Sequence, residues 1–205
     1  MNESAADGII DAEASDDQLI VVLAGPNGSG KTTFYETYLV ESGLRFVNAD
    51  LVGEQLGLTG YDAAVEAEKI REELVDQGTS FCMETVFSDP EGQKVAFLER
   101  AQRQGYTIVL VFICIESEDL CRARVMQRVD NGGHDVPDDK IVSRYVRSLG
   151  NLSSAARFVD RAYLYDNSSV DEPYRLVAEI RHGQTVRVNP PVPGWACSVD
   201  KYLED

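Results

Sequence analysis

The sequence predicts a three-layer α/β/α sandwich built on a mainly parallel, five-stranded β-sheet. Short apolar stretches alternate along the chain with helix-like stretches of about 10–20 residues. The apolar stretches are nearly continuous instead of alternating between polar and apolar residues, as strands are when helices cover both faces of a parallel sheet. Glycine follows several of the helix-like stretches, where it favours a helix end.

The expected strands are residues 19–24, 45–48, 80–83, 107–115 and 162–165. The expected helices between and after them are residues 31–41, 61–77, 88–104, 117–128 and 137–158. Ser88-Asp89-Pro90-Glu91 has the form of a capping box, so we expect Ser88 to cap the third helix. Residues 175–181 and 184–188 flank His182-Gly183 and predict a C-terminal β-hairpin.

Composition favours one domain, at residues 19–205, because the 205-residue chain is 43% hydrophobic and can bury one sizeable core. Residues 1–18 are acidic without Lys or Arg, and we expect a poorly ordered tail in which Ile9 and Ile10 offer little to dock. We expect a cytoplasmic protein, because there is no apolar run of membrane-spanning length, no secretory signal pattern and no C-x-x-C pair. The net charge of −16 disfavours nucleic acid as a partner.

A phosphate-binding loop follows the first strand, with the spacing G-x-x-x-x-G-K-[ST]. Glycines let successive backbone N–H groups point at phosphate oxygens, the lysine reaches the terminal phosphates and the threonine hydroxyl ligates Mg²⁺. The alternative is a glycine-rich turn with a chance lysine, but the order of strand, loop and helix favours a nucleotide site. The residues are Gly25, Pro26, Asn27, Gly28, Ser29, Gly30, Lys31, Thr32 and Thr33.

Acidic residues follow two other strands, and parallel strands place their C-terminal ends at one edge of a sheet. Asp50 is the candidate catalytic base, although an aspartate in this position can also simply cap a helix. Glu84 can hold a substrate hydroxyl or metal-bound water, with an ordinary strand-end carboxylate as the alternative. Thr85 and Ser88 are candidate hydrogen-bonding partners of a substrate, whereas the helical pattern places Glu68 on a solvated surface.

Arginines flank a segment at about residues 129–137 that we expect to act as a lid. Arg124 and Arg128 share one helical face before it, and Arg144 shares a face with Arg147 after it. Such arginines could neutralise the charge of transferring phosphate, and the alternative is a pair of solvated helix faces. His134 could contact phosphate or only cap the turn.

Several segments together resemble the zeta-toxin family, in its short bacterial form. They are residues 25–34, Asn48-Ala49-Asp50, Glu84-Thr85, residues 132–137, Arg144-Tyr145 and residues 165–168, and the resemblance spans about residues 19–168. Zeta toxins are ATP-dependent kinases, and the best-understood members phosphorylate the 3′-hydroxyl of the N-acetylglucosamine unit in UDP-N-acetylglucosamine.

The resemblance implies that Lys31 and Thr32 bind ATP and Mg²⁺, that Asp50 is the base, and that Glu84 binds substrate. It also makes Glu68 a substrate-contacting residue, against the pattern-based interpretation, and Arg124 or Arg128 a phosphate-contacting one. The sequence departs from the family where Thr85-Val86 follows the glutamate in place of Gly-Thr, and His134 lies where a second lid arginine is expected.

The resulting hypothesis is a small-molecule kinase that passes the ATP γ-phosphate to a hydroxyl of a nucleotide sugar, with UDP-N-acetylglucosamine as the preferred acceptor. The first alternative is a kinase for another nucleotide, dinucleotide or sugar. A second, from another class, is a P-loop ATPase or nucleotide switch that transfers nothing, against which Asp50 and Glu84 argue. A polynucleotide kinase is disfavoured by the acidic charge. The toxin hypothesis also implies an antitoxin protein as a partner.

Overall fold

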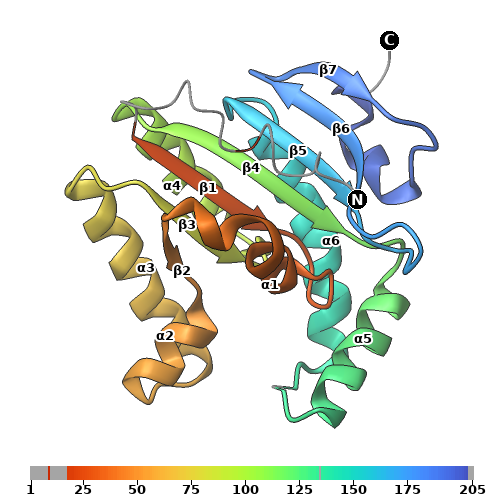
Figure 1. Cartoon of the computed structure of the whole chain (residues 1–205), viewed down its shortest axis with the longest axis horizontal. Coiled ribbons are helices and arrows are strands. Elements are labelled where there is room, and N and C mark those ends of the chain that lie inside the picture. Colours follow the sequence, from red (N-terminus) through yellow and green to blue (C-terminus); the bar gives the residue numbers. More distant parts are fainter. Residues whose placement is uncertain (1–8, 10–17, 134, 203–205) are drawn as a thin grey trace.

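The computed structural model describes residue 9, residues 18–133 and residues 135–202. Within these residues the chain forms one seven-stranded sheet in the order β2-β3-β1-β4-β5-β6-β7 (Figure 1). The first five strands in this order are parallel, and the last two pair antiparallel. The strands are β1 (Leu19–Ala24), β2 (Arg45–Val47), β3 (Phe81–Thr85), β4 (Thr107–Cys114), β5 (Arg161–Asp166), β6 (Arg175–Arg181) and β7 (Gln184–Val188).

The predicted class is therefore confirmed, but the strand number is wrong. The C-terminal hairpin, β6 and β7, was expected as a separate addition, whereas β6 pairs with β5 and extends the same sheet to seven strands. The pairing is favourable because β5 would otherwise be an edge with unpaired backbone groups.

Helices connect the parallel strands. They are α1 (Lys31–Phe34), α2 (Ala49–Leu56), α3 (Gly60–Asp76), α4 (Gln93–Arg103), α5 (Glu118–Asp130) and α6 (Asp138–Ala155), with a 3₁₀ segment at Gly194–Tyr202. The first helix was expected to be α-helical to residue 41, but it continues after Phe34 as a π-helix (Tyr35–Leu39) and a 3₁₀ turn (Val40–Ser42). Within it, the Thr37 hydroxyl donates to the Thr33 carbonyl at 2.7 Å, a contact that bends helices.

The start of α4 also differs from the prediction. The helix begins at Gln93 with Gly92 as its N-cap, so Ser88 caps nothing there. Phe87 has a φ of +57°, which is not helical, and its N–H donates to the Thr85 hydroxyl at 3.0 Å. Residues 86–92 are consequently a loop, and Asn151 of α6 supports it by donating to the Phe87 and Asp89 carbonyls at 3.0 and 3.1 Å.

Hydrophobic side chains pack on both faces of the sheet, as the three-layer prediction requires. Alternate residues of β1 divide between the two faces: Ile20 and Val22 pack with α3, α4, α5 and α6, and Val21 and Leu23 pack with Phe34 and Leu39. Ile9 belongs to the second cluster and is 1% exposed, which corrects the expectation that it offers little to dock. The other residues of the predicted tail lie outside the described residues.

The parallel strands bring all their C-terminal ends to one edge of the sheet. In Figure 1 the arrowheads of β1 and β4 point toward α1 and α5. The register places Leu23 beside Glu84 and Ile113 beside Tyr165, so the loops that follow β1, β3, β4 and β5 emerge together. None of the helices in the described ranges combines the length and the apolar composition needed to cross a membrane.

Candidate nucleotide and phosphoryl-transfer site

The loop after β1 has a backbone shape that only glycine allows at its two ends. Gly25 has a φ of +141°, and a Cβ there would lie 2.0 Å from the Ile113 carbonyl oxygen. Gly30, the N-cap of α1, has a φ of +95°, and its Cβ would lie 2.6 Å from the Asn167 amide nitrogen and 2.9 Å from the Tyr174 hydroxyl. The glycine spacing is thus explained by close packing against β4 and the segment after β5.

Lys31 opens α1 and is buried, with 6% of its surface exposed. Its Nζ donates to the Pro26 carbonyl at 2.9 Å, so the side chain folds back over the loop. Burial lowers the pKa of Lys31, and the negative charge of Glu84 partly offsets this effect. In a P-loop, a lysine held against the backbone of the loop is the arrangement expected for binding a nucleoside triphosphate.

Thr32, Glu84 and Asn48 form a hydrogen-bonded chain from the loop to β2. The Thr32 hydroxyl donates to Glu84 at 3.2 Å (Oε1) and 3.0 Å (Oε2). Asn48 Nδ2 donates to the Glu84 Oε2 atom at 2.8 Å. A hydroxyl and a carboxylate are therefore held side by side at the first turn after the loop, and both are ligand types that Mg²⁺ accepts.

Asp50 lies at the start of α2, and its role as a helix cap is excluded. The cap is Asn48, whose Oδ1 accepts from the backbone N–H groups of Asp50 and Leu51 at 2.7 and 3.1 Å. The Asp50 side chain is exposed, and within the described part of the chain it has no hydrogen bond or ion pair. Its carboxylate is therefore not used in capping the helix.

Arginines from two helices meet the loop. Arg124 of α5 packs beside Gly28, where a Cβ would lie 3.3 Å from the arginine Cβ, and it donates to the Ser168 carbonyl at 3.5 Å. Arg144 of α6 donates to the Asn27 side-chain oxygen at 3.4 Å, and burial together with Arg147 lowers its pKa. Arg128 is more exposed, but its charge is near enough to lower the pKa of Lys31.

The remaining candidates are less closely connected to the loop. Glu68 of α3 is 46% exposed and pairs with Lys94 of α4 at 3.1 Å. The Thr85 side chain is buried and accepts from the Phe87 N–H, so its hydroxyl supports the loop after β3. Ser88 is partly exposed in that loop. His134 lies outside the described residues, within the segment that joins α5 to α6.

Two residues that the sequence analysis did not identify hold the phosphate-binding loop from the other side. Asn167 donates from Nδ2 to the Ser29 carbonyl at 2.9 Å, and the Tyr174 hydroxyl donates to the Gly30 carbonyl at 2.9 Å. The position of Asn167 directly after β5, at the same edge of the sheet as the loop, is a signal that could have suggested its role. No residue near Tyr174 in the sequence indicates that its hydroxyl contacts Gly30. Asn48 was quoted beside Asp50, and an Asn before a helix is a recognisable cap signal.

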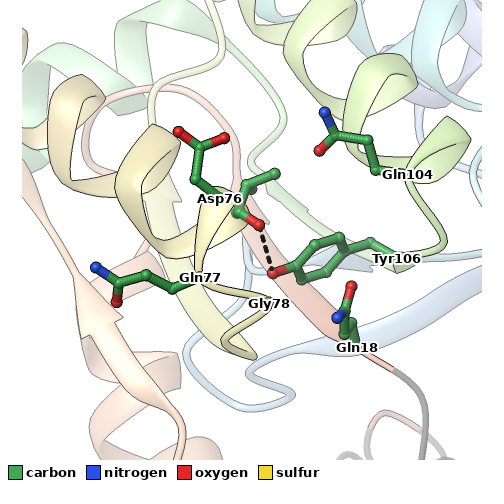
Figure 2. Close-up of a pocket in the computed structure, with 7 residues that line it drawn as sticks. Gln18, Asp76, Gln77, Gly78, Gln104 and Tyr106 are labelled. Carbon is green, nitrogen blue, oxygen red and sulfur yellow. Dashed lines mark hydrogen bonds between the residues drawn. The ribbon is translucent and has the colours of Figure 1, made fainter.

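A separate pocket of about 480 Å³ lies at the opposite edge of the sheet, near the starts of β1 and β4 (Figure 2). Gln18, Gly78 and Tyr106 line it, and the Tyr106 hydroxyl is already used in donating to the Leu74 and Val75 carbonyls at 3.1 and 3.4 Å. Its distance from the strand C-terminal ends separates it from the candidate site.

The fold and the loop define the class of this protein as a P-loop kinase-like α/β protein. The chain belongs to the AAA domain family AAA_33, whose model matches residues 20–145, more than half of its length. An uncharacterised protein of Haemophilus influenzae is 25% identical over an alignment of 130 residues that covers 61% of this chain and 91% of that protein.

Two solved structures share the fold. The complex of AvrRxo1-ORF1 and AvrRxo1-ORF2 with sulphate ions matches with a TM-score of 0.65 at 17% identity, over 97% of this chain and 68% of that one. A structure from the PezAT chromosomal toxin-antitoxin system of Streptococcus pneumoniae matches with a TM-score of 0.52 at 19% identity, over 80% and 72%. At these identities the likeness establishes the fold alone.

Proposed function

We propose that this protein is an ATP-dependent small-molecule kinase of the zeta-toxin type. The observation that carries the proposal is the contact between Thr32 and Glu84. It joins the residue that a P-loop uses for the metal to a strand-end carboxylate, and Asn48 links that carboxylate to the start of α2, where Asp50 is exposed. A nucleotide switch also uses a P-loop hydroxyl and one strand-end carboxylate for the metal, but it needs no second carboxylate such as Asp50 to take a proton from an acceptor.

ATP would bind with its phosphates on the backbone of residues 25–33 and Lys31 against the terminal phosphates. The structure of AvrRxo1-ORF1:-ORF2 with ATP, which matches with a TM-score of 0.59 at 15% identity, supports ATP as the nucleotide. The residues fit Mg²⁺: Thr32 would ligate it, and Glu84 would hold it through water. No group of three or more His, Cys, Asp and Glu suited to a protein-only metal site occurs among the described residues, which agrees with a metal held largely by phosphate and water. When bound, Mg²⁺ neutralises charge on the transferring phosphate.

Asp50 would accept the proton of the acceptor hydroxyl as that oxygen attacks the γ-phosphorus. Its carboxylate is exposed at the sheet edge, while Asn48 supplies the cap of the same helix. Arg124 and Arg144 contact the loop from two sides and would stabilise the charge that develops on the phosphate. Closure of the segment between α5 and α6, including His134, would bring Arg128 nearer and exclude water.

The acceptor we favour is UDP-N-acetylglucosamine, on the resemblance to zeta toxins and the shared fold of the PezAT structure. Glu68, Glu84, Thr85 and Ser88 would contact it or support the loop beside it. The same two similarities support a protein partner, an antitoxin that covers the ATP site.

The test is incubation with ATP and Mg²⁺ and a panel of nucleotide sugars, dinucleotides and free sugars, followed by mass spectrometry. We expect one phosphate to be added to UDP-N-acetylglucosamine. A phosphate added to a different compound of the panel would support the kinase activity and identify that compound as the acceptor. If ATP is hydrolysed and no compound of the panel is phosphorylated, the result would contradict the proposed kinase activity and favour a P-loop ATPase that transfers nothing.

A further inference from the structure

A pocket of about 300 Å³ lies between α3 and α4, on the face of the sheet opposite α1. Met83 of β3 and Phe97 of α4 provide apolar walls, and Gln93 is neutral, whereas its other large side chains are charged. Three of them are cations and two are anions: Arg71, Lys94 and Arg100 against Glu68 and Glu72. The pocket is therefore positive by one charge in a chain whose net charge is −16.

Each carboxylate of this pocket already has a cation. Glu68 pairs with Lys94 at 3.1 Å, and Glu72 accepts from Arg100 at 2.6 Å. These pairs are about half exposed on the glutamate side. The remaining cation is Arg71 of α3, which has no ion pair with either glutamate.

Arg71 is an unusual cation because it is 5% exposed and poorly hydrogen-bonded. Its Nη2 donates to the Glu84 carbonyl at 3.4 Å, and its buried Nε has no hydrogen-bond partner among the described residues. Burial lowers the pKa of Arg71 to about 10, and the charge of Glu68 offsets this only partly. A buried guanidinium without a paired acceptor is costly, so the unpartnered Nε requires an explanation, and an anionic group of a ligand would supply its acceptor.

The pocket is connected to the phosphoryl-transfer site through one residue. Arg71 contacts the carbonyl of Glu84, and the carboxylate of Glu84 accepts from Thr32. A ligand group on Arg71 would thus lie on one side of the end of β3, with the metal-binding hydroxyl on the other. An acceptor can span this separation only if its anionic group is distant from the hydroxyl that reacts.

We propose that the pocket between α3 and α4 binds an oxyanion of the acceptor, with Arg71 as the main partner and Lys94 as the second. This inference rests on the proposed function, because it takes the pocket's ligand to be the molecule that is phosphorylated. The planar guanidinium suits bidentate contact with phosphate or carboxylate, and the idle Nε supplies the donor for it. Lys94 can turn from Glu68 toward the anion. The acceptor is therefore an anionic molecule, and a neutral sugar is a poor one.

The binding test needs no turnover. The protein is labelled with ¹⁵N-arginine, the nucleotide site is filled with a non-hydrolysable ATP analogue and Mg²⁺, and the Nε–H signal of Arg71 is assigned by its loss in Arg71→Lys. Inorganic phosphate and acetate are then titrated separately. We expect a saturable shift of the Arg71 signal with one of them, which also tells a phosphate from a carboxylate ligand. A signal that neither anion shifts would overturn the proposal, since an arginine that only supports the Glu84 carbonyl would not respond.

The kinetic test uses whichever acceptor the panel identifies. Arg71→Lys keeps the positive charge but loses the planar guanidinium that can donate two hydrogen bonds to one anion. We therefore expect it to raise the KM for the acceptor about 10- to 100-fold while the KM for ATP stays unchanged. Lys94→Gln should raise the same KM less. Arg103→Gln removes an exposed charge of α4 that pairs with Glu99 outside the pocket, and it is the matched control.

An unchanged acceptor KM in Arg71→Lys would contradict the proposal. If the chain transfers no phosphate to any acceptor, the proposed function fails, but the titration still decides whether the pocket binds an oxyanion. The two failures are therefore distinguishable.

Discussion

The hydroxyl of Thr32 lies 3.0 Å from Oε2 of Glu84, although 52 residues separate them in the chain. The contact joins the first turn of α1 to the end of β3, two segments that the parallel pairing of β1 and β3 brings to the same edge. Asn48 reaches the same carboxylate oxygen from the end of β2. Three neighbouring segments thus fix the position of one carboxylate.

Glu84→Gln tests the role of this carboxylate. The amide keeps the shape but loses the charge that would hold metal-bound water, so we expect turnover to fall about 10- to 100-fold. Binding of ATP without Mg²⁺, measured by calorimetry, should be nearly unchanged. Glu91→Gln, an exposed acid in the loop before α4, is the control, and an equal loss there would refute a special role for Glu84.

Asn48 has two functions that substitutions can separate. Asn48→Ala removes both the cap of α2 and the contact with Glu84, and it should lower the free energy of unfolding by about 1 kcal/mol or more. Asn48→Ser keeps a capping oxygen but has no amide to donate to Glu84. We expect Asn48→Ser to unfold closer to wild type than Asn48→Ala, while both variants lose activity. Equal stability of the two variants in thermal unfolding would count against the capping role.

Gly25→Ala should disrupt the phosphate-binding loop. Its Cβ would lie 2.0 Å from the Ile113 carbonyl in a backbone conformation that disfavours side chains, and we expect destabilisation of about 2 kcal/mol or more together with loss of ATP binding. The matched variant is Gly43→Ala, which also has a positive φ (+72°) but no atom within 4 Å of the added Cβ. It should cost about 1 kcal/mol and leave ATP binding intact. Comparable effects in denaturant melts would show that φ alone is responsible.

Lys31 should give the chain a measurable dependence of stability on pH. Its pKa is lowered in the folded chain from 10.5, so the unfolded chain binds more protons as the pH rises between the lowered value and 10.5. Wild type should therefore gain stability relative to Lys31→Met across that window. Taking the difference in free energy of unfolding between wild type and Lys31→Met separates the contribution of Lys31 from those of tyrosines and cysteines that titrate in the same pH range. A difference independent of pH would contradict a buried, charged Lys31, and Lys31→Met should also weaken ATP binding strongly.

Much of this arrangement follows from local sequence patterns. The central strands were predicted because they are nearly continuous apolar runs, and Asp50 and Glu84 were placed at the sheet edge because each follows an expected strand. Cys82 and Cys114 lie buried in β3 and β4, as residues of such apolar runs do. Local patterns carry this information because a parallel sheet aligns all its strand ends.

What the sequence did not predict depends on contacts between distant residues. Arg71 lies on a helix of 17 residues rich in charge, and its burial and its contact with the Glu84 carbonyl depend on tertiary packing. Tyr174 and Asn167 reach the loop across 144 and 138 residues. Ser88 was misassigned because Ser-x-x-Glu matches a capping box, while Phe87 and Asn151 hold the chain there as a loop. The sheet was extended to seven strands by pairing that the hairpin sequence alone does not specify.

The central claim is that Asp50 removes the proton of an acceptor hydroxyl while ATP is held on the loop. The most direct measurement compares wild type with Asp50→Asn under single-turnover conditions, with ATP and Mg²⁺ and UDP-N-acetylglucosamine, or the acceptor that the panel selects. We predict that Asp50→Asn binds ATP with nearly unchanged affinity and forms phosphorylated acceptor at a rate lower by about 10²–10⁴-fold. Formation of the phosphorylated acceptor at the wild-type rate would contradict the account.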